Sequence, residues 1–321
     1  MDLDRMLHRC QTQQWSDDDL DWSPAPRALS AADEQLVVQM FTDMAAIERL
    51  AGAMFVEQAR RARDPRLRAI FESFVIDEER HAVVAERLAR HYDVHRLKAY
   101  AVTPALTAFA PPFLQAIRSV SDDVANGYIT AGELILDIAL LRSLDDFVAD
   151  PMSAQAMQRI NRDESRHIAI DYHMVAYYAS DEYLLDLHRR PSPPLRDQLR
   201  AARAMALVMV HAAPFFRGVF FDPLGRIDPS GRRIREVFKN IQLLAAKPGV
   251  RRRPIAKWFL LCMEVFNHPL TGRFLGGVTA RMVGVDRSVM SWLTTAEEMA
   301  RASRATFDEL AEQALRAKTI H

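Results

Sequence analysis

The chain contains 321 residues, of which 49% are hydrophobic and 26% are charged, the balance of a globular protein with a core to bury. Lys and Arg together number 42, as do Asp and Glu, so the formal net charge is zero and the basic character of a nucleic-acid-binding protein is missing. Two cysteines are too few for a disulfide framework or a cysteine-based zinc site, and no glycine-rich nucleotide-binding motif occurs.

The first ten residues, MDLDRMLHRC, are charged and lack the apolar core of a signal peptide. No stretch approaches the roughly 18 consecutive apolar residues of a membrane-spanning helix. We therefore expect a cytoplasmic protein with neither a nucleic acid nor a membrane among its partners. Its apolar content is compatible with a homodimer.

Residues 1–29 are acidic and irregular in pattern, and they predict an N-terminal arm. We expect this arm to pack over the body of the protein, because disordered tails rarely carry aromatic residues such as Trp15 and Trp22. Ser30-x-x-Asp33 resembles a helix capping box, and the apolar residues that follow it have helical spacing. The first long helix is therefore expected to begin at Ser30.

Asp64-Pro65 predicts the start of a second helix, which runs to about residue 95, because Asp is a good N-cap and Pro fits the first helical position. An irregular crossover is expected around the prolines that follow, Pro104, Pro111 and Pro112. A third helix is expected over about 120–148. Asp150-Pro151 predicts a fourth helix, running to about 180.

Three prolines, Pro191, Pro193 and Pro194, are expected to break the chain after the fourth helix. Residues 195–317 also have a helical pattern, with interruptions expected near five prolines: Pro214, Pro223, Pro229, Pro248 and Pro269. No convincing strand pattern occurs. The predicted fold is all-α, with a bundle of four helices over 30–185 and a helical C-terminal extension over 195–321 packed on it as one compact domain.

The second and fourth helices carry the same motif. Residues 77–81 read D-E-E-R-H and residues 163–167 read D-E-S-R-H, 86 residues later. The two Asp-Pro helix starts are separated by the same 86 residues. One Glu-x-x-His motif is expected about once by chance in a chain of this length, but two copies at a matched position indicate an internal duplication of a helix pair.

This spacing predicts a metal site. Residues three apart on a helix share one face, so Glu78 with His81, and Glu164 with His167, can each reach one ion. Glu48 on the first helix and Glu133 on the third are 85 residues apart and add one carboxylate each. A glutamate from each of two helices plus Glu-x-x-His from each of the other two is the ligand set of di-iron and di-manganese carboxylate bundles. Six ligands are thereby predicted: Glu48, Glu78, His81, Glu133, Glu164 and His167.

Glu133 lies in an apolar helix, where an unpaired carboxylate costs several kcal/mol. Asp137, one turn later, either supports the site from outside the ligand set or forms an ion pair. Small residues beside the glutamates, such as Gly52 and Gly132, leave room for a substrate or allow close helix packing. The alternative to a metal site is a set of buried acid–base pairs.

The motifs over about residues 31–180 resemble the ferritin-like di-iron carboxylate superfamily. Two copies of Glu followed after 28 or 29 residues by D-E-x-x-H are similar to the oxygenase branch, in particular to enzymes of the 4-aminobenzoate N-oxygenase type. The resemblance implies that two of the glutamates bridge the metal ions. It also implies that Asp77 supports His167 and Asp163 supports His81, with Arg80 and Arg166 balancing the buried aspartates.

Two positions depart from relatives within the superfamily. Ile160 stands where the N-oxygenase has a third histidine, which leaves His173 and His211 as candidates for an additional ligand or a substrate contact. Ala85 stands where the ribonucleotide reductase small subunit has its radical tyrosine. No catalytic residue beyond the metal ligands is predicted.

The resemblance implies a non-haem di-iron oxygenase that uses O2 to hydroxylate or N-oxygenate a small organic substrate. Its cofactor would be two iron ions, with a Mn/Fe pair using the same ligands, and electrons would come from an external reductase, ferredoxin or chemical reductant. One alternative is a ferroxidase or peroxide scavenger of the ferritin type, against which the long C-terminal extension argues. Another is a non-enzymatic helical interaction protein.

Overall fold

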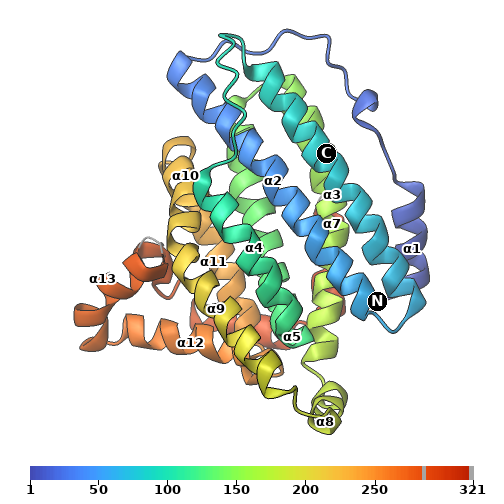
Figure 1. Ribbon diagram of the computed structural model, residues 1–321, viewed down its shortest axis with the longest axis vertical. Helices are drawn as coiled ribbons and strands as arrows, with labels where there is room; N and C mark the ends of the chain where they lie inside the picture. Colours follow the sequence, from blue (N-terminus) through green and yellow to red (C-terminus); the bar gives the residue numbers. More distant parts are fainter. Residues whose placement is uncertain (284–286, 318–321) are drawn as a thin grey trace.

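The computed structural model describes residues 1–283 and 287–317, and within these ranges the regular secondary structure is helical, without strands. Two pairs of long helices form the centre of the molecule (Figure 1). In the first pair, α2 (Ala31–Arg61) packs along α3 (Pro65–Tyr92). In the second, α5 (Asp122–Leu134) packs along α7 (Pro151–Tyr178). The pairs meet where α3 contacts α7 and α2 contacts α5.

Local capping explains where these long helices begin. The Ser30 hydroxyl accepts a hydrogen bond from the Asp33 backbone N–H at 3.2 Å. Asp64 and Asp150 accept from the backbone N–H two residues later, each at 2.8 Å, and a proline follows each as the first helical residue. The predicted starts of the first, second and fourth helices are confirmed.

The third long helix is continuous but changes its pitch. After α5, residues Ile135–Leu141 form a π-helical segment that leads into α6 (Arg142–Val148). The predicted helix over about 120–148 is confirmed in extent, whereas the π-helical segment has no signal in the apolar pattern. Such segments are rare and occur often at functional sites.

The N-terminal arm is more regular than its pattern indicated. Leu3–Thr12 form helix α1, in which Asp2 accepts a hydrogen bond from the Arg5 N–H and Leu3, Met6 and Cys10 are buried. The prediction of an irregular arm was wrong for these residues, because apolar side chains at helical spacing pack against α3. The predicted packing over the body is confirmed, since Trp15 and Leu20 are also buried.

The predicted irregular crossover was wrong, since Pro104–Ser119 form helix α4. Pro104 occupies the first turn, where a missing N–H costs nothing, but Pro111 and Pro112 lie inside the helix, where each costs about 3 kcal/mol. Burial outweighs this cost at about 1.5–3 kcal/mol for each large apolar side chain. The buried apolar residues have helical spacing: Leu106, Phe109, Phe113, Ala116 and Ile117.

The C-terminal half is helical as predicted. Its α-helices are α8 (Asp181–Arg189), α9 (Leu195–Phe215), α10 (Asp222–Ile227), α11 (Arg232–Ala245), α12 (Pro254–Asn267), α13 (Thr271–Val283), α14 (Ala296–Arg304) and α15 (Phe307–Ala317). The break at Pro191–Pro194 is confirmed, as are those at Pro229, Pro248 and Pro269. No break occurs at Pro214 or Pro223, because a π-helical segment over Phe216–Phe221 carries the chain from α9 into α10.

Two of these helical stretches are long and apolar enough, by length and composition alone, to cross a bilayer. Residues 122–148 form one of them, and 67% of its 18-residue apolar window is buried inside the protein, as in a core helix. Residues 195–227 form the other, and only 33% of its 18-residue apolar window is buried. This second stretch runs along α4, where the rings of Phe109 and Phe215 stack with their centroids 4.0 Å apart.

Candidate metal centre

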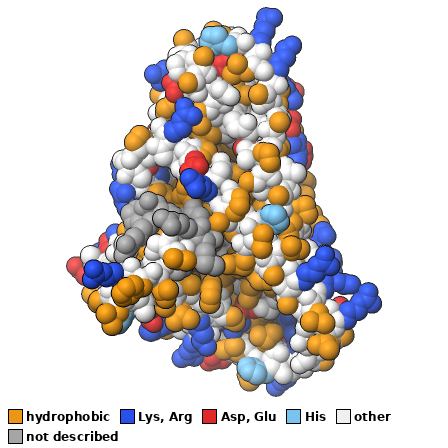
Figure 2. Space-filling view, turned by 60° about the vertical axis from the view of Figure 1, so that its left-hand side comes forward, with side chains coloured by type: hydrophobic (Ala, Val, Ile, Leu, Met, Phe, Trp, Pro, Cys, Tyr) orange, Lys and Arg blue, Asp and Glu red, His pale blue; other side chains and the backbone are white. Residues whose placement is uncertain are grey.

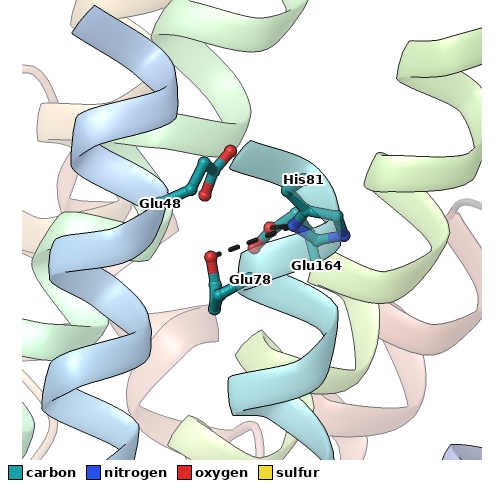
Figure 3. A group of neighbouring side chains, drawn as sticks. All are labelled: Glu48, Glu78, His81 and Glu164. Carbon is teal, nitrogen blue, oxygen red and sulfur yellow. Dashed lines mark ion pairs between the residues drawn. The ribbon is translucent and has the colours of Figure 1, made fainter. Parts of the chain in front are cut away.

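The four long helices bring all six predicted ligands to one point in the interior. Glu48 comes from α2, Glu78 and His81 from α3, Glu133 from α5, and Glu164 and His167 from α7. Each of these side chains is at most 2% exposed. Figure 3 shows Glu48, Glu78 and Glu164 turned toward the same space as the inner nitrogen of His81.

Two overlapping sets of four ligand atoms make up this cluster. In each set the atoms lie within 4.8 Å of one another. The first set comprises Glu48, Glu78, His81 and Glu164, and the second comprises Glu78, Glu133, Glu164 and His167. Because Glu78 and Glu164 belong to both sets, they are positioned to bridge two metal ions.

The distances to the histidines support this arrangement. Glu78 approaches His167 Nδ1 at 3.1 Å and His81 Nδ1 at 3.9 Å. Glu164 approaches His81 Nδ1 at 3.3 Å and His167 Nδ1 at 3.4 Å. Each carboxylate therefore faces both imidazoles, and the two ring centroids are 6.1 Å apart.

The atoms that face the centre lack hydrogen-bond partners within the described part of the chain. All of these atoms are buried: both carboxylate oxygens of Glu48, Glu78 and Glu164, Oε2 of Glu133, and Nδ1 of both histidines. Buried polar atoms are nearly always hydrogen-bonded, and buried charges are paired or coordinate a metal. The donor set of four carboxylates and two imidazoles therefore fits two divalent cations, whose charge would balance four carboxylates.

The pKa values of these groups show the electrostatic strain of the metal-free cluster. Burial raises the pKa of Glu48 to about 7, and burial together with neighbouring carboxylates raises the pKa values of Glu78 and Glu133 well above the usual range. Burial acts in the same direction on Glu164, but the two imidazoles outweigh it and hold its pKa well below that range. Bound cations would take the place of the protons that this crowding retains.

The outer nitrogen of each histidine faces the aspartate of the other copy of the motif, so each contact joins α3 and α7. His81 Nε2 donates to Asp163 Oδ2 at 3.2 Å, and His167 Nε2 lies 3.5 Å from Asp77 Oδ2. This is the cross-pairing that the resemblance implied. At His81 the carboxylate bonded to Nε2 fixes the ring orientation and leaves Nδ1 as the nitrogen for a metal. His167 Nε2 has no hydrogen bond within the described chain, so Asp77 acts on this ring through charge alone.

Two arginines neutralise these aspartates. Arg166 is 1% exposed and lies 3.0 Å from Asp77 and 2.8 Å from Asp163. Arg80 contacts Asp77 and lies 3.0 Å from Asp163. The two aspartates and two arginines thus form a closed network of balanced charge behind the histidines.

Sequence reasoning missed that the N-terminal arm completes this network. The Trp15 indole N–H donates to Asp163 Oδ2 at 2.6 Å, and its ring lies 5.0 Å from the Arg80 guanidinium carbon. Gln14 donates to Asp77 Oδ1 at 3.1 Å and accepts from Arg80. Two tryptophans in the arm indicated packing, but nothing in the sequence named the partners.

Asp171 is a second residue that sequence reasoning missed. It is fully buried on α7, one turn beyond His167, and Asn126 of α5 donates to its Oδ1 at 3.4 Å. Burial raises its pKa to about 8. The only signal available was its spacing of four residues from His167, which places both side chains on one face of the helix.

The remaining predicted site residues lie outside the six-residue cluster. Asp137 forms an ion pair with Arg142 at 3.3 Å, which matches one of its two expected roles. His173 lines a cavity of about 470 Å³ between the ends of α2, α3, α5 and α7. His211 is half-buried on α9, a helix that packs on α4. The structure therefore does not bring either histidine into the cluster.

Gly52 has a packing role beside the cluster. A Cβ at this position would lie 3.3 Å from the Glu78 Cβ, so the absence of a side chain allows α2 and α3 to approach closely. At Gly132 a Cβ would meet nothing within 4 Å. Close packing thus accounts for the first glycine and leaves the second unexplained.

No known family model matches the chain, and no curated protein matches its sequence.

Proposed function

We propose that the chain is a non-haem di-iron oxygenase with a ferritin-like four-helix bundle, formed by α2, α3, residues 122–148 and α7. One observation carries this proposal. A glutamate and a Glu-x-x-His motif occur twice, and the atoms that these residues point into the cluster are buried and lack hydrogen-bond partners in the described chain. The set matches the ligand pattern of ferritin-like di-iron carboxylate proteins. Oxygen and nitrogen ligands without thiolates suit iron or manganese.

Two iron ions bound there, with electrons from an external donor, would supply the reduction of O2 and the oxidation of a small organic substrate. Glu78 and Glu164 would bridge the ions, and the other four side chains would each hold one. Asp77 and Asp163 orient the imidazoles through their outer nitrogens. A Mn/Fe pair would use the same ligands.

Aromatic side chains exclude water from one side of this cluster. The ring centroids of Phe74 and Phe55 lie 4.1 Å and 5.2 Å from that of His167, and both phenylalanines are fully buried. An apolar wall protects the oxidising chemistry from solvent and strengthens the charge interactions inside.

We place the substrate in the cavity of about 470 Å³ at the ends of the four helices. This volume is in the usual range for small-molecule sites. Its wall contains apolar residues, charged residues such as Glu57, Arg61 and Asp122, and Asn126. The Asn126 amide donates to Asp171, one turn from His167, and links the cavity to the cluster, whose six residues do not line it. His173 on the same wall is positioned to contact the substrate.

Oxygen uptake by the iron-loaded protein tests this function. With a reductant and a panel of small aromatic amines, phenols and hydrocarbons, we expect O2 consumption that depends on the organic compound, and an oxygenated product by mass spectrometry. Glu164→Ala should abolish both, whereas Glu79→Ala, at a neighbouring exposed glutamate, should retain them.

The alternative function, a ferroxidase or peroxide scavenger, predicts a different result. Iron(II) or peroxide would then be consumed catalytically without any organic compound, and no oxygenated product would form. Repeated turnover of this kind, lost in Glu164→Ala, would replace the oxygenase assignment.

A further inference from the structure

A surface on three C-terminal helices carries large apolar side chains in contact with solvent. We call it the apolar platform and define it by residues of α9, α12, α13 and the α12–α13 turn: Leu195, Leu199, Leu207, Val210, Trp258, Leu261, Leu270, Phe274, Leu275 and Val278. Phe274 is 74% exposed, Leu195 71% and Trp258 61%. Figure 2 shows hydrophobic side chains gathered over the lower part of this face. The three helices are neighbours, because α13 contacts both α9 and α12.

The helices α9 and α12 pack on the rest of the protein through other faces than those that form the platform. On α9 the buried positions Ala204, Val208 and Ala212 lie on one face, whereas Leu199 and Val210 lie on the opposite face. On α12 Met263 and Phe266 are buried while Trp258 and Leu261 are exposed. A surface helix normally has a polar outer face, and a large exposed apolar patch marks an interaction site.

The charges on these three helices are mostly positive. Exposed cations lie at Arg196, Arg200, Arg203, Lys257 and Arg273. The described acidic residues of the same helices are Asp197, which lies 3.7 Å from Arg200, and Glu264. On α9, Arg196 and Arg203 alternate with Leu199 and Leu207 along the exposed face, so cations and apolar groups meet the same partner.

We propose that the apolar platform docks on the surface of an anionic phospholipid bilayer, with α9 and the α12–α13 pair in the interfacial plane. Exposed Trp, Phe and Leu side chains enter the headgroup boundary, and long basic side chains reach the phosphates. The site differs from a spanning helix, since α9 remains bound to α4 along its buried face. This proposal departs from the expectation of no membrane partner, which followed from the absence of an apolar run long enough to span a bilayer.

Charge favours a bilayer over a second copy of the chain as the occupant. Two copies joined through this platform would bring their arginines and lysines together, and facing like charges oppose association. Anionic headgroups supply the complementary charge, and each basic residue near such a surface adds to the attraction.

Co-sedimentation of the full-length chain with vesicles tests this proposal. We expect binding to vesicles of phosphatidylcholine with 30% phosphatidylglycerol, at least about 10-fold weaker binding to pure phosphatidylcholine, and weakening with salt. Trp258→Ser combined with Phe274→Ser, and separately Arg196→Glu combined with Arg203→Glu, should each reduce binding at least about 10-fold. Circular dichroism would show that the variants are folded, because all four positions are exposed.

A matched control uses apolar residues that are exposed elsewhere. Val56 on α2 and Ile76 on α3 are 48% and 60% exposed, so Val56→Ser with Ile76→Ser should leave vesicle binding unchanged. The proposal is overturned if the wild type does not bind anionic vesicles, or if the control pair loses binding equally. It is also overturned if the platform variants disrupt only a dimer, measured by sedimentation velocity, which would assign the face to a second copy.

Discussion

Replacing Glu133 by methionine should stabilise the metal-free protein and weaken the stabilisation that metal binding provides. Glu133 is 2% exposed among buried apolar residues such as Ile129 and Leu134, and its Oε2 has no hydrogen-bond partner in the described chain. Burial and the nearby Glu164 carboxylate raise its pKa well above the usual range. An unpartnered buried polar group costs about 1–3 kcal/mol, and methionine has a similar length without that cost.

The metal-free Glu133→Met variant should therefore gain about 1–3 kcal/mol in free energy of unfolding. The wild type should gain about 2.7 kcal/mol when metal is added at one hundred times its dissociation constant, and the variant should lose most of this gain. Urea denaturation under anaerobic conditions, with and without Fe(II), measures the free energy of unfolding of the wild type and of the variant in both states. The variant should be more stable than the wild type without metal and less responsive to it.

Glu57 provides a matched control on the same bundle. It is also buried, but its carboxylate is paired with Arg60 at 2.9 Å and Arg118 at 2.7 Å, and its pKa is lowered. Glu57→Met should destabilise the protein by about 1 kcal/mol, because both arginines are largely exposed, and the metal response should stay intact. A metal-free Glu133→Met protein that is less stable than the wild type would refute the reasoning and favour a structural acid–base pair.

Further predictions concern the supports of the cluster. Asp163→Asn should lower iron affinity about 10–100-fold in anaerobic Fe(II) titrations, because it removes the charge that orients His81; unchanged affinity would show that this contact has no such role. Gly52→Ala should weaken iron binding while leaving the helical content seen by circular dichroism intact, because its methyl group displaces Glu78; affinity equal to wild type would contradict the close approach. The metal-free protein should lose stability as the pH rises from 5 to 7, because burial raises the pKa of Glu48 from 4.5 to about 7 and the folded state retains a proton there. Burial lowers the pKa of His81, but Asp163 and Glu164 outweigh burial and raise this pKa from 6.5 to about 10. The stabilising positive charge of His81 is therefore lost as the pH rises from about 6.5 to 10. Metal replaces these protons, so the rise in melting temperature on adding metal should grow from pH 6 to pH 8; a rise that shrinks would contradict the ligand assignment.

The sequence predicts the starts of the long helices and the meeting of the six cluster residues because those signals are local or repeated. Asp64-Pro65 and Asp150-Pro151 fix helix starts through contacts with the next two residues. The repeated motif at a spacing of 86 residues then places equivalent residues on equivalent helices. The first inference is local, whereas the second also uses the ligand pattern of carboxylate helix bundles.

What the sequence could not predict depends on contacts between distant residues. Helix α4 continues through Pro111 and Pro112 because its apolar face is buried against α9, a partner that its own residues do not reveal. Trp15 reaches Asp163 across 148 positions of sequence. Asp171 becomes part of the site's surroundings only because Asn126 of another helix meets it.

Elemental analysis of the metal content tests the central claim most directly. The full-length protein would be loaded with Fe(II) under anaerobic conditions and desalted, together with Glu164→Ala and the exposed control Glu79→Ala. The account predicts about two iron ions per chain in the wild type and the control, and a clear loss in Glu164→Ala. Little or no iron in the wild type, or the same content in Glu164→Ala, would contradict a dinuclear centre at these six residues.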